Sequence, residues 1–417
     1  MAGVWKTVKL GELVDFRTGK LDSNAAVSEG EYPFFTCSQE TLRTSTYSFD
    51  TECVLLAGNN ANGIFPLKYY HRKFDAYQRT YVITSRDKSR LDNRFLYYAL
   101  RPKLAEFRSV STGAATKFLT LKILNDAQIS LPPFSAQRRI ASILGAYDDL
   151  IEVNRRRIAL LEEMARRLFE EWFVRFRFPG SESHATITTP DGPLPQGWDR
   201  VAIGATLEHA IGGTWGSEAP DDSNTDECFV LRGTDFPGLR GGEFREVPRR
   251  FVPARTLSSR LLRDNDIVLE VSGGSKDQPV GRAVFIADQL LRALGGACTF
   301  ASFCRLMRVN TQRASPYQLF WHVDHMYRTR TIEAYQSQST GLRNFKFTVF
   351  SEKEFLRLPP QSIRQRFDSM AAPIMEQLAT LSCQISSLRR NRDLLLPRLI
   401  SGELSVAAAE RELELVA

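Results

Sequence analysis

The chain has 417 residues, of which 43% are hydrophobic and 25% are charged. This composition is that of a folded protein with two or three domains, and it excludes a disordered, collagenous or fibrous chain. The 55 lysines and arginines exceed the 48 aspartates and glutamates by a net charge of +7, which permits a polyanionic partner without requiring one. No apolar run reaches the roughly 20 residues of a membrane-spanning helix, and the N-terminus lacks a secretory signal pattern. We therefore expect a cytoplasmic protein without a membrane partner.

The cysteines are spaced irregularly and include no Cys-x-x-Cys pair. They stand at positions 37, 53, 228, 298, 304 and 383. This spacing fits neither a zinc site nor a disulfide framework, so buried free thiols are expected.

The chain contains an internal duplication. Ser-Thr-Gly at residues 111–113 and Leu-Pro-Pro at 131–133 recur in the same order at 339–341 and 358–360. Upstream, Trp5 corresponds to Trp198, and the apolar residues 54–56 correspond to 268–270. The separation between matching positions grows along the chain, so the second copy carries insertions. Matches in a conserved order predict that one architecture is built twice.

Each copy has a strand-rich segment followed by a long helix. Short β-branched and aromatic runs, such as residues 80–83 and 282–285, predict strands. Two consecutive prolines fit neither a strand ladder nor a helix, so the helices should begin just after them, with Ser135 and Ser362 as N-caps. The fold class predicted is α+β, with two similar mixed domains separated by a long antiparallel helical pair. The boundaries expected are 1–133 for the first domain, 134–179 for the first helical spacer, 180–196 for a linker, 197–360 for the second domain, 361–402 for the second spacer and 403–417 for a tail.

A strict seven-residue repeat runs along both predicted helices. In the first it comprises Ile140, Tyr147, Asn154, Leu161 and Leu168, and in the second Phe367, Ile374, Leu381, Leu388 and Leu395. A second series, apolar except for Arg392, lies four residues after these positions. Such a repeat predicts that the helices pair with each other as a coiled coil, with Asn154 fixing the register. The alternative is that each helix lies on its own domain.

The ends of this arrangement carry two further expectations. Pro397 should kink or end the second helix near Gly402, and the tail with Glu410, Glu412 and Glu414 should be solvated. A helix of roughly 40 residues spans about 60 Å, so the pair would act as a spacer between two domains related by a pseudo-two-fold axis. That symmetry matches a bipartite, inverted site on duplex DNA.

Sequence signals for catalysis are missing. Residues 131–134, Leu-Pro-Pro-Phe, imitate the shape of an adenine methyltransferase motif, but leucine has no oxygen to accept from the base. There is no phosphate-binding loop for ATP, and Pro220-Asp221 lacks the Glu-x-Lys of a metal nuclease. His322 and His325 are too few for a metal site. We expect no catalytic residue and no metal in this chain.

The layout resembles the specificity subunit of type I restriction-modification enzymes. The resemblance covers nearly the whole chain and is carried by Leu-Pro-Pro with Gln-Arg-Arg-Ile at 137–140, LFEEWF at 168–173 with Phe-Pro at 178–179, Pro-Gln-Gly-Trp at 195–198, and LLLPRLISGEL at 394–404. The second copy departs from the family's usual Glu-Gln pair with Arg-Gln-Arg at 364–366.

The resemblance implies a DNA-recognition chain with two target recognition domains. Its implied partners are double-stranded DNA, two methyltransferase subunits and restriction (translocase) subunits. The partners would then bind S-adenosylmethionine, ATP and Mg, and this chain would hold no cofactor. The partners would also carry out the adenine methylation or the cleavage. The alternatives are a recognition chain serving a different defence effector, and a scaffold whose two domains bind proteins.

Candidate DNA-binding residues lie in basic, aromatic and glycine-rich segments of both copies. Lysine and arginine neutralise phosphates, glutamine and arginine reach base edges, and small residues let the backbone approach a groove. The candidates are Asn59, Asn60, Asn62, Lys68, Arg72, Lys73, Gln78, Arg79, Lys117, Ser272, Gly274, Ser275, Lys276, Arg343, Asn344 and Lys346. For residues 68–74 the alternative is a strand with buried tyrosines and a solvated charged face. The helical arginines at 155–157 and 389–392 are assigned to partner binding or spacing, as are the ten residues of the seven-residue repeat.

Overall fold

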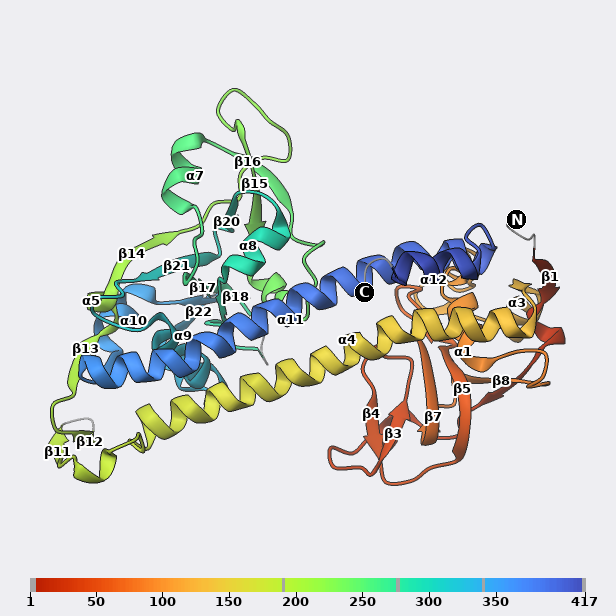
Figure 1. Cartoon of the computed structure of the whole chain (residues 1–417), viewed down its shortest axis with the longest axis horizontal. Coiled ribbons are helices and arrows are strands. Elements are labelled where there is room, and N and C mark those ends of the chain that lie inside the picture. Colours follow the sequence, from red (N-terminus) through yellow and green to blue (C-terminus); the bar gives the residue numbers. More distant parts are fainter. Residues whose placement is uncertain (1–4, 190–191, 275–277, 340–341, 415–417) are drawn as a thin grey trace. The chain divides into compact units, whose positions relative to one another are not determined.

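The computed structural model, which describes residues 5–189, 192–274, 278–339 and 342–414, forms two compact units. The first unit consists of residues 1–150 and 388–417, and the second of residues 151–387. Two long helices, α4 (Phe134–Phe169) and α11 (Gln361–Ser401), each contribute to both units (Figure 1). The C-terminal end of the chain therefore completes the unit that the N-terminal end begins.

The first unit is built on a mainly antiparallel sheet with the strand order β2-β8-β5-β7-β3-β4. Its central strand β5 is apolar and almost wholly buried at its C-terminal half, from Cys53 to Ala57. The strands are β1 (Lys6–Lys9), β2 (Val14–Thr18), β3 (Tyr32–Phe35), β4 (Leu42–Thr44), β5 (Phe49–Ala57), β6 (Asn59–Asn60), β7 (Leu67–Ala76), β8 (Thr80–Ser85), β9 (Lys117–Phe118) and β10 (Gln128–Leu131). The shorter helices are α1 (Asn93–Leu100), α2 (Lys103–Val110), α3 (Leu121–Asp126) and α12 (Val406–Glu414).

The second unit repeats this plan with insertions. Its main sheet has the order β14-β21-β17-β19, and a further sheet has the order β16-β15-β20. The strands are β11 (Thr186–Thr189), β12 (Gly192–Pro195), β13 (Asp199–Ala202), β14 (Leu207–Gly212), β15 (Asp226–Leu231), β16 (Arg249–Val252), β17 (Ile267–Glu270), β18 (Ser272–Gly273), β19 (Ala283–Phe285), β20 (Cys298–Phe300), β21 (Cys304–Val309), β22 (Gln336–Ser339), β23 (Leu342–Phe345) and β24 (Phe355–Leu358). The shorter helices are α5 (Ile203–Thr206), α6 (Phe236–Arg240), α7 (Ala254–Arg260), α8 (Asp288–Leu294), α9 (Pro316–Arg328) and α10 (Phe347–Lys353).

The strand pairing confirms the duplication. The order β2-β8-β5-β7 in the first unit matches β14-β21-β17-β19 in the second. Before each Leu-Pro-Pro, a closing strand pairs antiparallel with the opening strand of its copy: β10 with β1, and β24 with β13. The predicted strands at residues 80–83 and 282–285 correspond to β8 and β19. The α+β class predicted from the sequence is therefore confirmed, while the predicted domain boundaries stay predictions.

The helix starts differ from the prediction. Helix α4 begins at Phe134 and α11 at Gln361, so Ser135 and Ser362 lie inside the first turn and are not N-caps. The carbonyl of Pro133 accepts the first helical hydrogen bonds, from the amides of residues 136 and 137, and Pro360 does the same in the second copy. A proline suits this position because the residue before the first helical turn needs only its carbonyl.

The two long helices contact each other within each unit. In the second unit, Trp172 beyond the end of α4 packs on Phe367 near the start of α11, with ring centroids 5.7 Å apart. Nearer the start of α4, the buried Asn154 donates from Nδ2 to Oε1 of Gln384 at 3.3 Å. Later residues along α4 therefore contact earlier residues of α11, as in an antiparallel pair of helices. In the first unit, Leu144 of α4 and Leu399 of α11 share one core.

The C-terminal segment agrees with the prediction where the helix ends, near Gly402, and differs from it in the tail. Helix α11 continues through Pro397 to Ser401, because Pro397 lies on the exposed face, where water can replace the lost hydrogen bond. It ends at Gly402, whose φ of +79° favours glycine. The tail then forms α12 and is not simply solvated: Leu404 is buried, and Glu410 pairs with Arg139. The side chains of Glu412 and Glu414 lie outside the described residues.

The cysteines are free thiols. Cys53, Cys228, Cys298 and Cys304 are buried as expected, whereas Cys37 and Cys383 are half-buried. Burial raises the pKa of the Cys53 thiol to about 12, with a smaller contribution from the charge of Glu52. In the described part of the chain, no helix has the length and apolar character needed to cross a membrane.

Candidate nucleic-acid interface

Three segments that are distant in the sequence meet at one corner of the first unit. Strand β5 ends at Ala57, and after Gly58 the chain forms β6. Strand β6 pairs with β9, so that Asn60 lies opposite Lys117. The amide of Gly58 donates to the carbonyl of Arg79 at 2.8 Å. The Arg79 guanidinium lies 5.6 Å from the centroid of the Phe118 ring. The corner therefore gathers asparagine, arginine and lysine from the three segments.

The glycine and asparagine loop at this corner is tightly folded. Asn60 Oδ1 accepts from the amide of Asn62 at 3.0 Å. Asn59 Oδ1 is buried and has no hydrogen-bond partner among the described residues. Gly63 has a φ of +66°, and a Cβ there would lie 3.3 Å from the Lys117 side chain. Glycine at this position thus lets the loop approach the lysine closely.

The basic and aromatic stretch at residues 68–74 lies inside strand β7. Lys68 Nζ donates to the carbonyls of Ser38 and Glu40 and to Thr41 Oγ1, at 3.0 to 3.2 Å. Burial lowers the pKa of Lys68, and the nearby Glu40 opposes this effect. Its three donors are used within the domain, so the expectation that Lys68 neutralises a phosphate loses its support.

The other candidates of this stretch are available at the surface. Arg72, Lys73 and Gln78 are exposed. Lys73 Nζ lies 4.5 Å from the centroid of the Tyr47 ring, and its hydrogen bond to the Tyr47 hydroxyl raises the pKa of the lysine.

The second unit has the same corner. Strand β17 ends at Glu270, and β18 follows and pairs with β23, so that Gly273 lies opposite Arg343. The amide of Val271 donates to the carbonyl of Phe303 at 2.8 Å, as Gly58 does to Arg79. The amide of Phe345 donates to the carbonyl of Val271, and in the first copy the amide of Leu119 donates to the carbonyl of Gly58. Lys117 and Arg343 therefore occupy equivalent positions in the two copies.

The second corner holds several predicted residues. Ser272 Oγ donates to Asn344 Oδ1 at 2.8 Å, and Arg343 Nη1 lies 3.5 Å from Gln336 Oε1. Lys346 is exposed. Gly274 has a φ of +71°, so this position favours glycine for backbone reasons. Ser275 and Lys276 lie outside the described residues.

Arg305, the second residue of β21, was not among the residues predicted from the sequence. Its side chain is half-buried, with Nε inaccessible to solvent and without a hydrogen-bond partner among the described residues. The guanidinium lies 4.3 Å from the centroid of the Phe347 ring, and burial lowers the pKa of this arginine. Alternation along a strand indicates that Arg305 leaves the core face, but no local pattern shows that it lacks a carboxylate partner.

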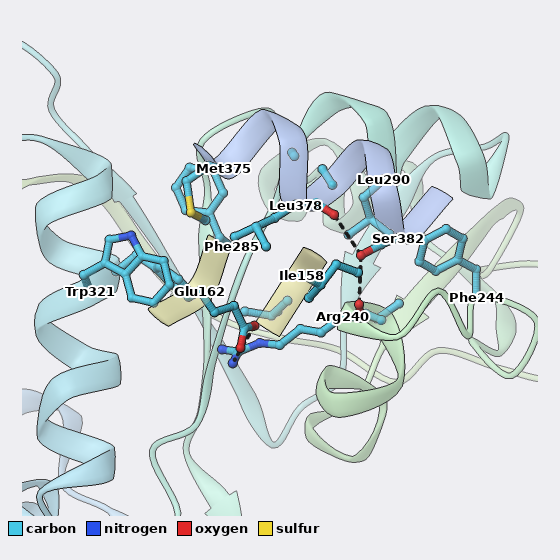
Figure 2. Close-up of a pocket in the computed structure, with 15 residues that line it drawn as sticks. Ile158, Glu162, Arg240, Phe244, Phe285, Leu290, Trp321, Met375, Leu378 and Ser382 are labelled. Carbon is cyan, nitrogen blue, oxygen red and sulfur yellow. Dashed lines mark hydrogen bonds and ion pairs between the residues drawn. The ribbon is translucent and has the colours of Figure 1, made fainter. Parts of the chain in front are cut away.

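A separate pocket in the second unit lies between the long helices and the sheet domain (Figure 2). Its volume is about 70 Å³, and apolar side chains from α4, α8, α9, α11 and the strand β19 form most of its wall. Glu162 Oε1 lies 3.6 Å from Arg240 Nη1 at its edge, and Ser382 Oγ lies 2.8 Å from the Arg240 carbonyl. Asp324, which is largely buried, contacts Arg166 and Arg240 nearby. These contacts hold the domain on the helices and offer no chemistry for a ligand.

The two histidines considered as metal ligands have carboxylate neighbours. His322 Nε2 lies 2.9 Å from Glu354 Oε1, and His325 Nδ1 lies 3.5 Å from Glu170 Oε1. The described residues contain no group of three or more His, Cys, Asp and Glu side chains arranged to hold a metal. The geometry thus gives the histidines structural neighbours rather than a metal site.

The first copy is similar in sequence to known proteins. Residues 3–163 match the family model of the type I restriction modification DNA specificity domain. A specificity subunit of the Escherichia coli type I restriction enzyme EcoDI is 38% identical over 176 residues, which is 42% of this chain and 38% of the relative. The chain is therefore similar to type I restriction-modification specificity subunits, and it spans well under half the length of the EcoDI relative.

Further relatives extend the likeness beyond the first copy. The MjaIX specificity subunit of Methanocaldococcus jannaschii is 26% identical over 320 residues, which is 75% of this chain and 69% of the relative. A crystal structure of a type I S subunit from M. genitalium matches this chain over 95% of its length and 96% of the length of the S subunit, with a TM-score of 0.62 and 13% identity. The fold likeness thus includes both copies, and the resemblance expected from the sequence is confirmed.

The structure also shows how Arg364 in the second copy takes the place of Gln137 in the first. Gln137 near the start of α4 donates to the carbonyls of Arg90 and Pro132, and so holds the loop before α1. The equivalent position near the start of α11 is Arg364, which donates to the carbonyls of Gln312 and Arg313 before α9. The arginine performs the same fastening role as the glutamine.

Proposed function

We propose that this chain is the sequence-specific DNA-binding subunit of a type I restriction-modification complex and recognises a bipartite target. The observation that carries the proposal is the corner that occurs twice, with Lys117 and Arg343 at equivalent positions beside a strand end. A basic group held on a short, fixed hairpin suits contact with the DNA backbone, and neighbouring polar side chains suit base edges. Each domain would read one part of the target.

The catalytic steps would belong to partner subunits. Two methyltransferase subunits would bind S-adenosylmethionine and modify adenine, and restriction subunits would use ATP and Mg²⁺. This division fits a chain in which the polar clusters of the described residues are internally paired, as around Asp324 and Glu354. The chain would then position the target without itself reacting with DNA.

The exposed face of α4 offers a docking surface for a methyltransferase subunit. Val153, Leu160 and Met164 are 49%, 66% and 57% exposed and lie on one side of the helix at spacings of seven and four residues. The residues of the seven-residue repeat are buried or half-buried and cannot meet a partner without separating the helices. The matching positions of α11 are Thr380, Ser387 and Asn391, so the apolar stripe belongs to α4 alone.

Salt dependence of binding to duplex DNA tests the recognition function. Binding of the full chain to its target should weaken steeply with added salt and should exceed binding to random duplex by orders of magnitude. Binding that is weak, insensitive to salt and indifferent to sequence would instead favour a protein-binding scaffold.

Co-purification tests the docking surface separately. The substitution Leu160→Glu should lower the amount of captured methyltransferase subunit to about half or less while leaving the thermal unfolding of the chain unchanged, because Leu160 is mostly exposed. Ser387→Glu at the matching position of α11 is the control and should leave capture intact. Equal capture by both variants and the wild type would exclude the stripe as the docking surface.

A further inference from the structure

We propose that Arg305 and Lys346 form a binding site for one phosphate of the DNA backbone in the second recognition domain. The proposal rests on the DNA-binding function proposed above and assigns a residue that the sequence patterns did not reveal. Both residues line an open hollow of about 510 Å³ at the second corner. Its other lining residues include Ser272, Asn344 and Phe303.

The charge of Arg305 is not compensated within the protein. Two nearby arginines, Arg308 in the same strand and Arg282 just before β19, are bound by buried carboxylates. Asp266 lies 2.7 Å from Arg308, and Glu270 lies 2.8 Å from Arg282. Arg305 has neither a salt bridge nor a hydrogen bond to the described residues, and no carboxylate is among the residues lining the hollow. A half-buried cation without a counter-charge is costly, so an anion entering the hollow would relieve that cost.

The guanidinium is also held in place before any ligand arrives. It lies 4.3 Å from the centroid of the Phe347 ring, in reach of a cation–π contact. A planar guanidinium fixed in this way loses little conformational freedom when it binds a phosphate through two parallel N–H groups. Lys346, the residue before Phe347, adds a second positive charge on the exposed rim of the hollow.

The shape of the site favours backbone over base. The sugar-phosphate backbone is the projecting part of duplex DNA, whereas base edges lie on the floor of the grooves and are reached by projecting side chains. A concave, basic surface therefore fits a phosphate. The exposed Phe303, 57% accessible, borders the hollow and would pack against the adjacent sugar.

The site belongs to the second copy only. The strand pairing places Arg305 opposite Leu269, as it places Tyr81 opposite Leu56 in the first copy. The Tyr81 hydroxyl donates to the carbonyl of Leu119 at 2.8 Å, which closes the position with an internal hydrogen bond. The two domains thus share the corner, but only the second has a half-buried arginine at this position.

The test measures the affinity of the full chain for one DNA duplex that contains its target sequence, identified from the adenines methylated in cells. The measurement is repeated over a range of salt concentrations. Arg305→Gln should weaken binding roughly tenfold or more and reduce the slope of log affinity against log salt by about one, with the sequence preference unchanged. Lys346→Gln, at an exposed position, should reduce the slope without affecting folding. Arg292→Gln removes an equal charge from α8, where Arg292 pairs with Asp288, and should change neither quantity.

Three results would overturn the proposal. If Arg305→Gln and Lys346→Gln bind as Arg292→Gln does, the hollow does not contact DNA. If Arg305→Gln instead relaxes the preference at a single base pair, Arg305 reads a base edge. If the wild-type chain shows no affinity for duplex DNA, the proposed function fails together with this site.

Discussion

Lys117 and Arg343 lie at the same register position in the two halves of the chain, one opposite Asn60 and the other opposite Gly273. If both face phosphates, Lys117→Gln and Arg343→Gln should each lower affinity evenly across DNA sequences and reduce the salt slope by about one. Salt-dependent binding measurements test this expectation. Arg167→Gln, a 76% exposed arginine on α4, is the matched control and should bind like the wild type. A sequence-dependent loss in either variant would contradict the shared phosphate role.

The C-terminal tail should stabilise the first unit. Leu404, Val406 and Ala409 are buried in the same core as the N-terminal strands. Deleting residues 403–417 exposes that part of the core, and we expect the free energy of unfolding to fall by about 3–5 kcal/mol, as measured by chemical denaturation. Arg139→Gln breaks only the exposed ion pair with Glu410 and should change stability little. Equal stability of the truncated and full chains would show that the tail is dispensable.

The carboxylate of Asp324 should be essential for the second unit. Its side chain is 9% exposed and contacts Arg166, Arg240 and Arg328. Asp324→Asn removes the carboxylate that these arginines share. Arg166 and Arg240 keep Glu162, and Arg328 keeps Glu170, so the free energy of unfolding should fall by about 1–3 kcal/mol. Tryptophan fluorescence during urea denaturation measures the change. Glu163→Gln removes an exposed pair with Arg167 on α4 and should have almost no effect. Comparable effects of both substitutions would argue against a buried network.

Acid should destabilise the second unit partly through Glu354. Burial raises the pKa of this carboxyl, but hydrogen bonds from His322 and Tyr335 outweigh it, so that the folded-state pKa lies below the ordinary value of 4.5. The folded state therefore favours the charged form. This contribution is present above about pH 4.5 and is lost as the pH falls through the folded-state value.

The variant Glu354→Gln isolates that contribution. Denaturation midpoints of the wild type should decrease more steeply than those of the variant as the pH is lowered from about 5. Parallel decreases in the two proteins would mean that Glu354 does not contribute to acid sensitivity.

The sequence predicted those features that depend on local pattern or on order along the chain. The duplication, the long helices and strands such as β8 follow from repeats and periodicity, because neighbouring side chains alone determine them. The Ser-Thr-Gly motifs also placed basic candidates after the same motif in both copies, whereas the equivalence of Lys117 and Arg343 comes from the strand register.

Features that depend on distant contacts were not predicted. Lys68 has the residue type of a phosphate ligand, yet a loop about 30 residues away uses its donors. Arg305 became a candidate only because the folded sheet brings no carboxylate to it. The burial of the tail was missed for the same reason, since Leu404 finds its core in strands and helices at the other end of the chain.

Exchange of one domain tests the central claim most directly. Residues 1–133 are replaced by those of a relative with a different target, and methylated adenines are sequenced in cells that carry the chain with its partner subunits. One half of the methylated sequence should change, while the other half and the spacing between them stay the same. A target that changes in both halves, or in neither, would contradict the account of two independent reading domains.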